Sequence, residues 1–409
     1  MSQSSQQRLN FSVPRAALTF ACLQGALAAV TQVVRSNLTW LVAQTQPTMS
    51  LRVVLQMISG LLAISLAPLA AATAKRLGGS RLVATLAFLV VPLSLGMSWV
   101  AAGGSMLVRN ILIYGIGVAF IQTFSFSAHE EFLSSLVGQQ NDRARNKAIV
   151  IKLRNAIQFI GRVVIWIALA IGALTVTGVA AAKNTYLLEA VFLIVFGVVV
   201  LTLRKKTNRQ EREATPLDAP AGEPWQWNHP LLGVFVLEFS LNCFFLGALM
   251  LPRLLPDKSL STLYYVMAIG GVGSILGTLF TRMTPRSLWG FILLDIITIL
   301  FTYSQQSTMG IAFGWGLANM CYGATDTIFA RAVQAGTSDR AANLASIRRL
   351  LMAGFLNFTL YGIVKAQGFF VLSERQICFV SIALTSLLVS FCWLKRKWIN
   401  QALNVAVRT

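Results

Sequence analysis

Asp142-Arg-Ala-Arg-Asn-Lys-Ala148 and Asp339-Arg-Ala-Ala-Asn-Leu-Ala345 are two copies of one string, D-R-A-x-N-x-A, placed 197 residues apart in a chain of 409 residues. Each copy follows one long apolar segment and leads into another. A repeat at about half the chain length indicates two related halves. In membrane proteins such halves often enclose a binding site for something that is carried across. The string therefore predicts a membrane protein built from two similar parts.

The composition excludes a large soluble domain. The chain is 56% hydrophobic and 12% charged, and its mean hydropathy is +0.67, whereas soluble domains carry about 25% charged residues. Apolar runs of about 20 residues, the length that crosses a bilayer as a helix, recur from end to end. They lack the alternation of β-barrel strands. The expected fold class is therefore all-α, a polytopic membrane protein.

The apolar segments predict twelve transmembrane helices in a 6+6 pseudo-repeat, that is, two six-helix bundles. The N-terminal bundle covers 1–203, a charged, proline-containing cytoplasmic linker covers 204–230, and the C-terminal bundle covers 231–409. The helices are expected at about 13–34, 53–74, 82–103, 105–127, 154–177, 184–203, 231–252, 262–281, 287–304, 308–331, 347–366 and 369–394.

The net charge of +20 would suggest a nucleic-acid partner in a soluble protein. Here its distribution indicates topology instead. With twelve spans and both termini in the cytoplasm, most of the 34 lysines and arginines fall in loops on the cytoplasmic side. We therefore expect a multi-pass protein of the bacterial inner (plasma) membrane that contacts lipid and binds no nucleic acid.

Few residues point to catalysis or to metal binding. The five cysteines are scattered in apolar segments without a CxxC pair, and His129 and His229 are the only histidines. No G-x-x-x-x-G-K-[ST] phosphate loop occurs. The triplet His129-Glu130-Glu131 favours a solvated helix end, because consecutive helical residues point about 100° apart. We expect no enzyme activity, no cofactor and no metal site.

A second repeated feature follows the second and eighth predicted helices. The copies read Ala71-Ala-Thr-Ala-Lys-Arg-Leu-Gly-Gly-Ser-Arg81 and Gly277-Thr-Leu-Phe-Thr-Arg-Met-Thr-Pro-Arg-Ser287. Both place small residues at a helix end, where helices can approach closely, and then a tight basic turn that favours the cytoplasmic side.

With these loops the chain resembles the major facilitator superfamily. Members of that family have 6+6 helices, a long cytoplasmic linker and a G-x-L-A-D-R-x-G-R-R-type loop after helices 2 and 8. The D-R-A-x-N-x-A strings fall where the family often has an acidic/Arg-Gly-Arg-Ala loop before helices 5 and 11. Two features depart from its patterns. Lys75 and Thr281 stand at the family's Asp position, and the fifth predicted helix, Phe159-Ile-Gly-Arg-Val-Val-Ile-Trp166, lacks the Gly-Pro pair of many drug antiporters.

The resemblance implies that the two halves rock against each other and that the loops take part in gating. The alternative is that these basic loops only orient the helices. The loop residues that the resemblance implies for gating are Lys75, Arg76, Asp142, Arg143, Arg282, Asp339 and Arg340.

Charged residues inside the predicted spans are the best site candidates, since each costs about 2.5–3.5 kcal/mol at the bilayer centre. Glu238 lies about seven residues into the seventh helix, and Asn242 follows one turn later on the same face. In the family, helices 1, 4, 7 and 10 line the central cavity. The resemblance thus makes Glu238 the first candidate for a protonatable coupling or substrate-contacting group. A structural ion pair is the alternative.

Arg162, about eight residues into the fifth helix, could pair with Glu238 or Asp326, or bind an anionic group of a substrate. Arg35 and Arg109 are expected at the external ends of the first and fourth helices, where they would extend into water or form a positive rim. Further polar residues on the cavity-type helices could bond a substrate or each other, namely Gln24, Gln32, Gln122 and Asn319.

Two other carboxyls carry weaker expectations. Asp295, central in the ninth helix, should face the bundle or stay protonated, because a lipid-facing carboxylate is implausible. Glu189, near the external end of the sixth helix, should extend toward water.

The function predicted from these residues is secondary active transport of a small organic molecule by alternating access. Proton-coupled export of a metabolite, drug or siderophore-like compound by a monomer is the first hypothesis. Import of an organic anion with protons, using Arg35, Arg109 and Arg162, is the alternative. A non-transporting receptor or assembly factor on the same scaffold is a third.

Overall fold

The computed structural model describes residues 13–45, 50–77, 79–103, 108–137, 143–173, 180, 182–211, 230–242, 250–279, 285–335, 362 and 373–401. Throughout this part the regular elements are helices, and no strand occurs in it. The all-α class expected from the sequence is confirmed.

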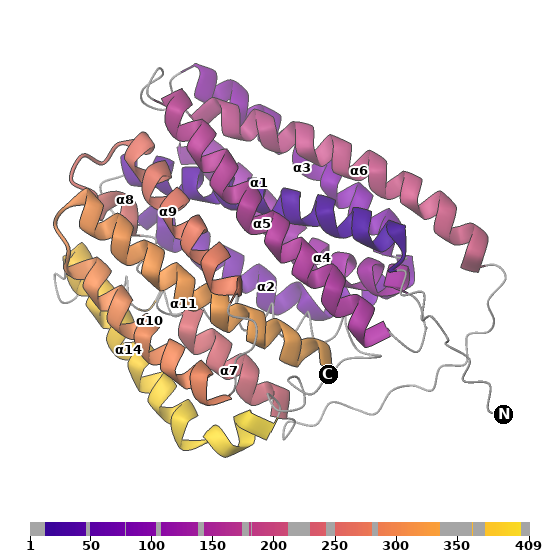
Figure 1. Cartoon of the computed structure of the whole chain (residues 1–409). Helices are drawn as coiled ribbons and strands as arrows, with labels where there is room; N and C mark the ends of the chain where they lie inside the picture. The colour runs from indigo at the N-terminus through magenta and orange to yellow at the C-terminus, as the bar shows by residue number, and fades with distance from the viewer. Residues whose placement is uncertain are drawn as a thin grey trace, which may run out of the picture.

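The helices form two groups along the chain (Figure 1). The N-terminal group consists of α1 (Arg15–Thr45), α2 (Ser50–Leu77), α3 (Gly79–Ala102), α4 (Val108–Val137), α5 (Arg143–Ala173) and α6 (Lys183–Glu211). The C-terminal group consists of α7 (Pro230–Asn242), α8 (Leu251–Leu254), α9 (Leu260–Leu279), α10 (Pro285–Ser304), α11 (Thr308–Ala335) and α14 (Glu374–Leu394).

Most predicted spans coincide with a helix. α7 and α8 both fall on the segment predicted at 231–252, and the helix predicted at 347–366 lies almost wholly outside the described residues. α1 and α6 run further than expected. α6 continues to Glu211, so the first residues of the expected linker are helical.

Eight helices of the described part are long and apolar enough to cross a membrane. α2 adds a ninth if its two segments, Met57–Leu66 and Pro68–Ala74, which meet at 54°, count as one span. The bend falls at Pro68, where the ring removes a helical hydrogen bond. Large apolar side chains also point outward, such as Trp99, 80% exposed, and Leu279, 71% exposed. This surface suits lipid, as in a multi-pass integral membrane protein.

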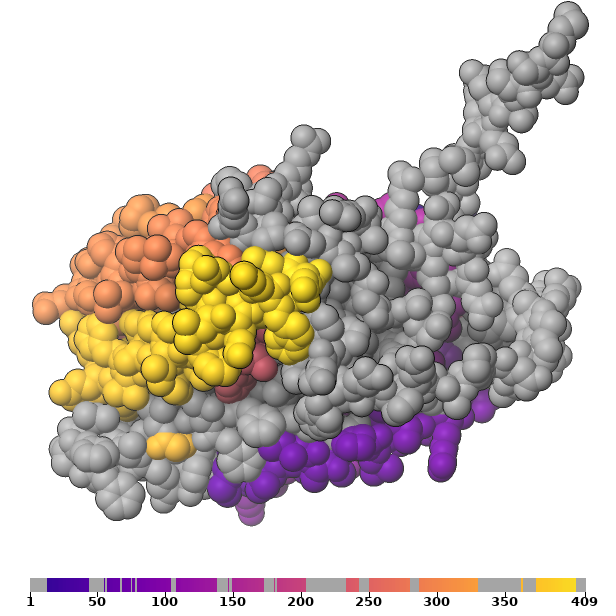
Figure 2. Space-filling view, turned by 90° about the horizontal axis from the view of Figure 1, so that it is seen from below, coloured from indigo at the N-terminus to yellow at the C-terminus, as the bar shows by residue number. Residues whose placement is uncertain are grey.

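The two groups repeat the same pattern of neighbours. In the N-terminal group α3 packs against α4 and α6, α2 against α4, and α1 against α6. In the C-terminal group α10 packs against α11 and α14, α9 against α11, and α7 against α14. Figure 2, seen from below, shows yellow α14 beside the orange residues of the C-terminal group.

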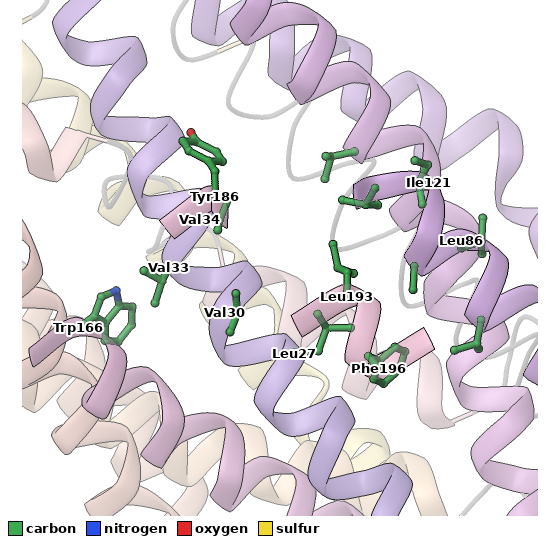
Figure 3. Close-up of a cluster of buried hydrophobic side chains, with 14 of the residues drawn as sticks. Leu27, Val30, Val33, Val34, Leu86, Ile121, Trp166, Tyr186, Leu193 and Phe196 are labelled. Atoms are coloured by element: carbon green, nitrogen blue, oxygen red, sulfur yellow. The ribbon is translucent and has the colours of Figure 1, made fainter. Parts of the chain in front are cut away.

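The core of the N-terminal group is apolar and centred on α1 (Figure 3). Leu27 and Val30 of α1 lie on the side of Leu193 and Phe196 of α6. Trp166 of α5 lies on the other side of α1. Where burial removes apolar surface from water, it stabilises the fold by about 25 cal/mol per Å² of that surface. Within lipid there is no water to displace, so close packing of the side chains contributes more of the stability.

Glycines allow the closest helix contacts. A Cβ on Gly25 of α1 would lie 2.5 Å from the carbonyl oxygen of Arg154 in α5. A Cβ on Gly273 of α9 would lie 1.9 Å from the carbonyl oxygen of Gly316 in α11. Small residues at these points let the backbones approach, and the α9–α11 contact is the tighter of the two.

Among the described residues, the two groups meet mainly where α5 packs against α9. A Cβ on Gly271 of α9 would lie 2.6 Å from Cγ2 of Val163 and 3.2 Å from the ring of Trp166, both on α5. The position of α5 between its own group and α9 is visible in Figure 1.

Candidate functional site

Arg35 lies within helix α1, contrary to the expectation that it ends the first helix. α1 continues ten residues beyond it, to Thr45, which is about 15 Å of helix. The guanidinium Nη2 donates a hydrogen bond to Oε1 of Gln122, in the middle of α4. The Arg35 side chain nevertheless remains exposed.

Glu189 on α6 is buried and hydrogen-bonded, so the expectation that it extends toward water is wrong. Its side chain is 2% exposed. Its Oε2 atom accepts hydrogen bonds from the Ser94 hydroxyl of α3 at 2.7 Å and the Tyr114 hydroxyl of α4 at 2.6 Å. The positive charge of Arg35 acts on the same carboxyl. Three helices of the N-terminal group, α3, α4 and α6, are thus joined by one hydrogen-bonded network.

Arg162 on α5 lies where the two helix groups meet. Its guanidinium carbon is 5.4 Å from the centre of the Phe159 ring, within the range of a cation–π contact. The charge of Asp326 and the polar Tyr322, both on α11, act on it from the C-terminal group, and Arg35 acts on it from α1. Its buried Nε has no hydrogen-bond partner among the described residues. The structure thus brings Arg162 close to Asp326, one of the two partners expected.

We call Arg35, Gln122, Glu189, Tyr114 and Arg162 the Arg35 cluster. It joins two guanidinium groups, one carboxyl and two neutral polar groups. Two like charges near one another repel unless an anion lies between or beside them. The two positive charges of the cluster can therefore attract an anionic group, and the Glu189 carboxyl can hold a proton.

Glu238 of α7 is 3% exposed, and Asn242 donates from Nδ2 to the Glu238 main-chain carbonyl at 2.8 Å. The two residues therefore share one face, but the amide bonds the backbone of its own helix. Asp295 of α10 is fully buried, as expected for a carboxyl facing the bundle. Neither of its carboxyl oxygens has a hydrogen-bond partner among the described residues.

The remaining polar candidates are dispersed. Gln24 is 9% exposed, and its Oε1 has no hydrogen-bond partner in the described part of the chain. Gln32 is half-buried, and its main-chain carbonyl accepts from the Ser36 hydroxyl. Asn319 donates to the carbonyl of Trp315 at 2.8 Å. Arg109 is exposed in the first turn of α4.

Most of the loop residues expected to take part in gating lie outside the residues, or outside the side chains, that the structure describes. Asp142, Arg282, Asp339 and Arg340 are not described, and neither are the side chains of Lys75 and Arg143. Arg76 is exposed near the end of α2. Asn146, the fifth residue of the first D-R-A-x-N-x-A string, is 5% exposed, so this part of the string packs into the protein.

The triplet at 129–131 is not a solvated helix end. The Glu130 carboxylate forms an ion pair with Arg154 of α5 at 2.9 Å. The His129 ring packs edge-on against Phe20 and Phe196, with ring centres 6.1 and 5.5 Å away. Within the described residues no three His, Cys, Asp or Glu side chains are grouped so that they could hold a metal ion.

Hydrogen bonds join the two helix groups at the end where α1 finishes and α6 and α9 begin. We call this the distal end and define it by Asn37, Trp40, Thr185, Lys258 and Tyr264. Asn37 donates to the Thr185 hydroxyl and accepts from the Tyr264 hydroxyl. The Trp40 indole donates to the Lys258 carbonyl at 3.2 Å. The Asn37–Tyr264 and Trp40–Lys258 hydrogen bonds therefore join the two groups at the distal end.

Sequence reasoning missed Tyr114, Asn37 and Tyr264, and it placed Glu189 in water although the side chain is buried. Glu189 lies six residues after the start of α6, or about 9 Å along it. That depth could have indicated a buried, hydrogen-bonded side chain, since a carboxyl so far inside an apolar helix needs hydrogen-bond donors from other helices. The first helix was expected to end at about residue 34, yet Ser36 and Asn37 lie within α1 and are buried.

Comparison with models of known protein families finds no match to this sequence, and no curated protein matches it.

Proposed function

We propose that this chain is a secondary active transporter of the major-facilitator type, with two six-helix bundles related by a 6+6 repeat. The matching neighbour patterns support this arrangement. α3 has the same relation to α4 and α6 that α10 has to α11 and α14. The repeated D-R-A-x-N-x-A string and the repeated basic loops supply the same symmetry from the sequence. Such repeats rock around a site between them.

One observation carries the proposal: charged side chains lie at the junction of the two helix groups. Arg162 of α5 interacts with Asp326 of α11 across that junction, and Arg35 lies near it. A charge at membrane depth costs about 2.5–3.5 kcal/mol on insertion scales. A receptor or assembly factor on this scaffold has no need to bear that cost at its internal junction, whereas a transporter uses such groups to bind its cargo.

The distal end supports an alternating mechanism. The bonds Asn37–Tyr264 and Trp40–Lys258 join the two groups there. With both termini in the cytoplasm this is the external side, so transport requires these contacts to open.

The substrate is a small organic molecule, and the coupling ion is the proton. Three buried carboxyls are available to carry that proton: Glu238, which the sequence favoured, Glu189 and Asp295. Export of an amphipathic compound was the first expectation. The presence of Arg35 beside Arg162 favours the second candidate, uptake of an organic anion, because two guanidiniums together select negative charge.

Cross-linking the distal end tests alternating access. The five native cysteines are removed, and Trp40→Cys is combined with Lys258→Cys. The protein is reconstituted in vesicles and offered a uniformly ¹³C-labelled extract of bacterial metabolites, with uptake measured by mass spectrometry. Treatment with a short bis-maleimide should abolish uptake of the transported compound.

The matched control is the pair Ser98→Cys and Lys183→Cys. The Ser98 hydroxyl bonds the Lys183 carbonyl at 3.2 Å within the N-terminal group, so a cross-link there should leave uptake intact. If no labelled compound enters the vesicles with either pair before treatment, the transport proposal fails. Equal uptake before and after cross-linking of the 40/258 pair would exclude opening at the distal end.

A further inference from the structure

Three consecutive cations follow the end of α14. Lys395, Arg396 and Lys397 are all exposed, and their side chains form no hydrogen bond or ion pair with the described residues. The 21 residues of α14 extend about 32 Å, so the cations lie where a membrane-length helix leaves the hydrocarbon. Three positive charges without a carboxylate beside them can attract an anion from outside the protein.

Packing fixes the position of these cations. Residues 396–401 form a short helix after a turn at Lys395, and in Figure 1 this yellow segment runs from the end of α14 toward α7. Ile399 is buried, and a Cβ on Gly233 of α7 would lie 2.7 Å from the ring of Trp398. The short helix is therefore held against the C-terminal group, and its cations belong to a folded surface.

Tryptophan rings lie beside the cations. The guanidinium carbon of Arg396 is 4.7 Å from the centre of the Trp393 ring, which is a cation–π contact. Trp393 packs edge-on against Trp289 of α10, with ring centres 5.0 Å apart, and the Trp289 indole donates to Oδ1 of Asn400 at 3.3 Å. Tryptophan is enriched where the hydrocarbon of a bilayer meets its headgroups. The rings therefore place the three cations at headgroup depth.

An exposed apolar stripe on α14 leads to the same point. Leu387, Phe391 and Leu394 are each more than half exposed, and their spacing of four and three residues places them on one face of the helix. The main-chain N–H of Lys395 still bonds the Phe391 carbonyl at 3.4 Å, so Lys395 continues this row by one turn. The stripe suits an acyl chain, and the cations at its end suit a phosphate.

We propose that this surface binds an anionic phospholipid, with its phosphate at Lys395, Arg396 and Lys397 and an acyl chain along the stripe. Ammonium and guanidinium groups are the usual protein donors to phosphate. A zwitterionic phospholipid brings its own cation beside the phosphate, which the three charges repel, so the surface selects a headgroup with net negative charge. Binding of this lipid does not depend on the transport proposal.

Native mass spectrometry tests the selectivity on the unaltered chain. The full-length protein is freed of copurified lipid in detergent and titrated with phosphatidylglycerol or with phosphatidylcholine that has the same acyl chains. Phosphatidylglycerol should be retained at concentrations at least about tenfold lower, because several cations act on its net charge. Equal retention of the two lipids would overturn the proposal, and this comparison needs no variant to fold.

The variant Lys395→Gln/Lys397→Gln locates the site. Each cation at an anionic lipid contributes about fivefold in affinity, so the dissociation constant of phosphatidylglycerol should rise about 25-fold. Arg76→Gln/Arg81→Gln is the matched control, since it also removes two exposed cations, and it should change the constant by less than about twofold. If both variants lose the lipid equally, or if neither loses it, the lipid is not bound at the end of α14.

Thermal unfolding separates a lipid from a dissolved phosphate. Phosphatidylglycerol should raise the unfolding temperature of the unaltered protein and of Lys395→Arg/Lys397→Arg, which keeps both charges, but should not raise that of Lys395→Gln/Lys397→Gln. Glycerol phosphate, the headgroup without acyl chains, should cause no shift. An equal shift with glycerol phosphate would overturn the lipid assignment, and no shift with phosphatidylglycerol in the unaltered protein would mean that the three cations only orient the helix in the membrane.

Discussion

The two helix groups share a pattern of neighbours but hold their helices together differently. In the N-terminal group a polar network links α3, α4 and α6 through Ser94, Tyr114 and Glu189. In the C-terminal group α9 and α11 approach until Gly273 nearly touches the backbone of Gly316. There the buried carboxyl of Asp295 has no hydrogen-bond partner among the described residues. The contrast teaches that one scaffold can repeat while its two halves join their helices through different contacts.

The largest effect should come from Gly273→Ala. The added Cβ would lie 1.9 Å from the Gly316 carbonyl oxygen, so the helices must separate, at a cost of about 3 kcal/mol. A thiol-reactive dye can follow thermal unfolding, because Cys321, Cys378 and Cys392 are buried. Gly290→Ala is the control, with nothing within 4 Å of its Cβ. A Gly273→Ala protein as stable as the control would show that α9–α11 packing is not decisive.

Glu189→Leu should destabilise the protein by about 2 kcal/mol. The change leaves the hydroxyls of Ser94 and Tyr114 buried without their acceptor, and each such loss costs about 1–3 kcal/mol in water-soluble proteins and less in membranes. The same dye measurement applies. Adding Tyr114→Phe and Ser94→Ala should recover part of the loss, and a failure to recover any would argue against the network.

Asp295→Leu should act in the opposite direction, raising stability by about 1 kcal/mol. Here no donor is abandoned, and a buried unsatisfied carboxyl is replaced by an apolar group of similar size. A clear loss of stability would mean that Asp295 makes a contact the comparison overlooks. Leucine variants of Glu189 and Asp295 measured side by side test the contrast between the groups directly.

The smallest effect concerns Asp257, in the turn before α9. Burial alone would raise the pKa of this carboxyl, but hydrogen bonds from Thr262 and Ser259 outweigh it, and its pKa lies below the ordinary value. A carboxyl of this kind stabilises the folded state above its unfolded pKa of about 3.9 and loses that contribution as the pH falls through its lowered folded pKa. The side chain is exposed, so solvent screening keeps the effect small.

The unfolding temperature should therefore fall slightly as the pH is lowered through the folded pKa, by more in the unaltered protein than in Asp257→Asn. An identical pH dependence in both proteins would show that the turn does not contribute. Lys258 in this turn has φ of 50° and offers its carbonyl to Trp40.

Reading of the internal charges from the sequence succeeded where a single helix decides the outcome. Asp295 faces the bundle as predicted, and Asn242 lies on the face of Glu238. The predictions for charged residues failed where the position of the side chain depends on where its helix ends or on groups from a neighbouring helix. Arg35 was expected at a helix end, but α1 continues past it to Thr45, and Trp40, Leu41 and Val42 of that extension are buried. Glu189 was expected to extend toward water. Its hydrogen-bond donors lie on α3 and α4, so the sequence around Glu189 does not reveal them.

Hydropathy along the chain is sufficient to establish an all-α protein with membrane-length helices, since spanning a bilayer needs about 20 consecutive apolar residues and this is a local property. The partners of buried polar groups are not local. Ser94 and Tyr114 stand 95 and 75 residues from Glu189, and Gln122 stands 87 residues from Arg35. Which of them meet depends on how each helix is rotated and shifted against its neighbours, and only the packed structure decides that.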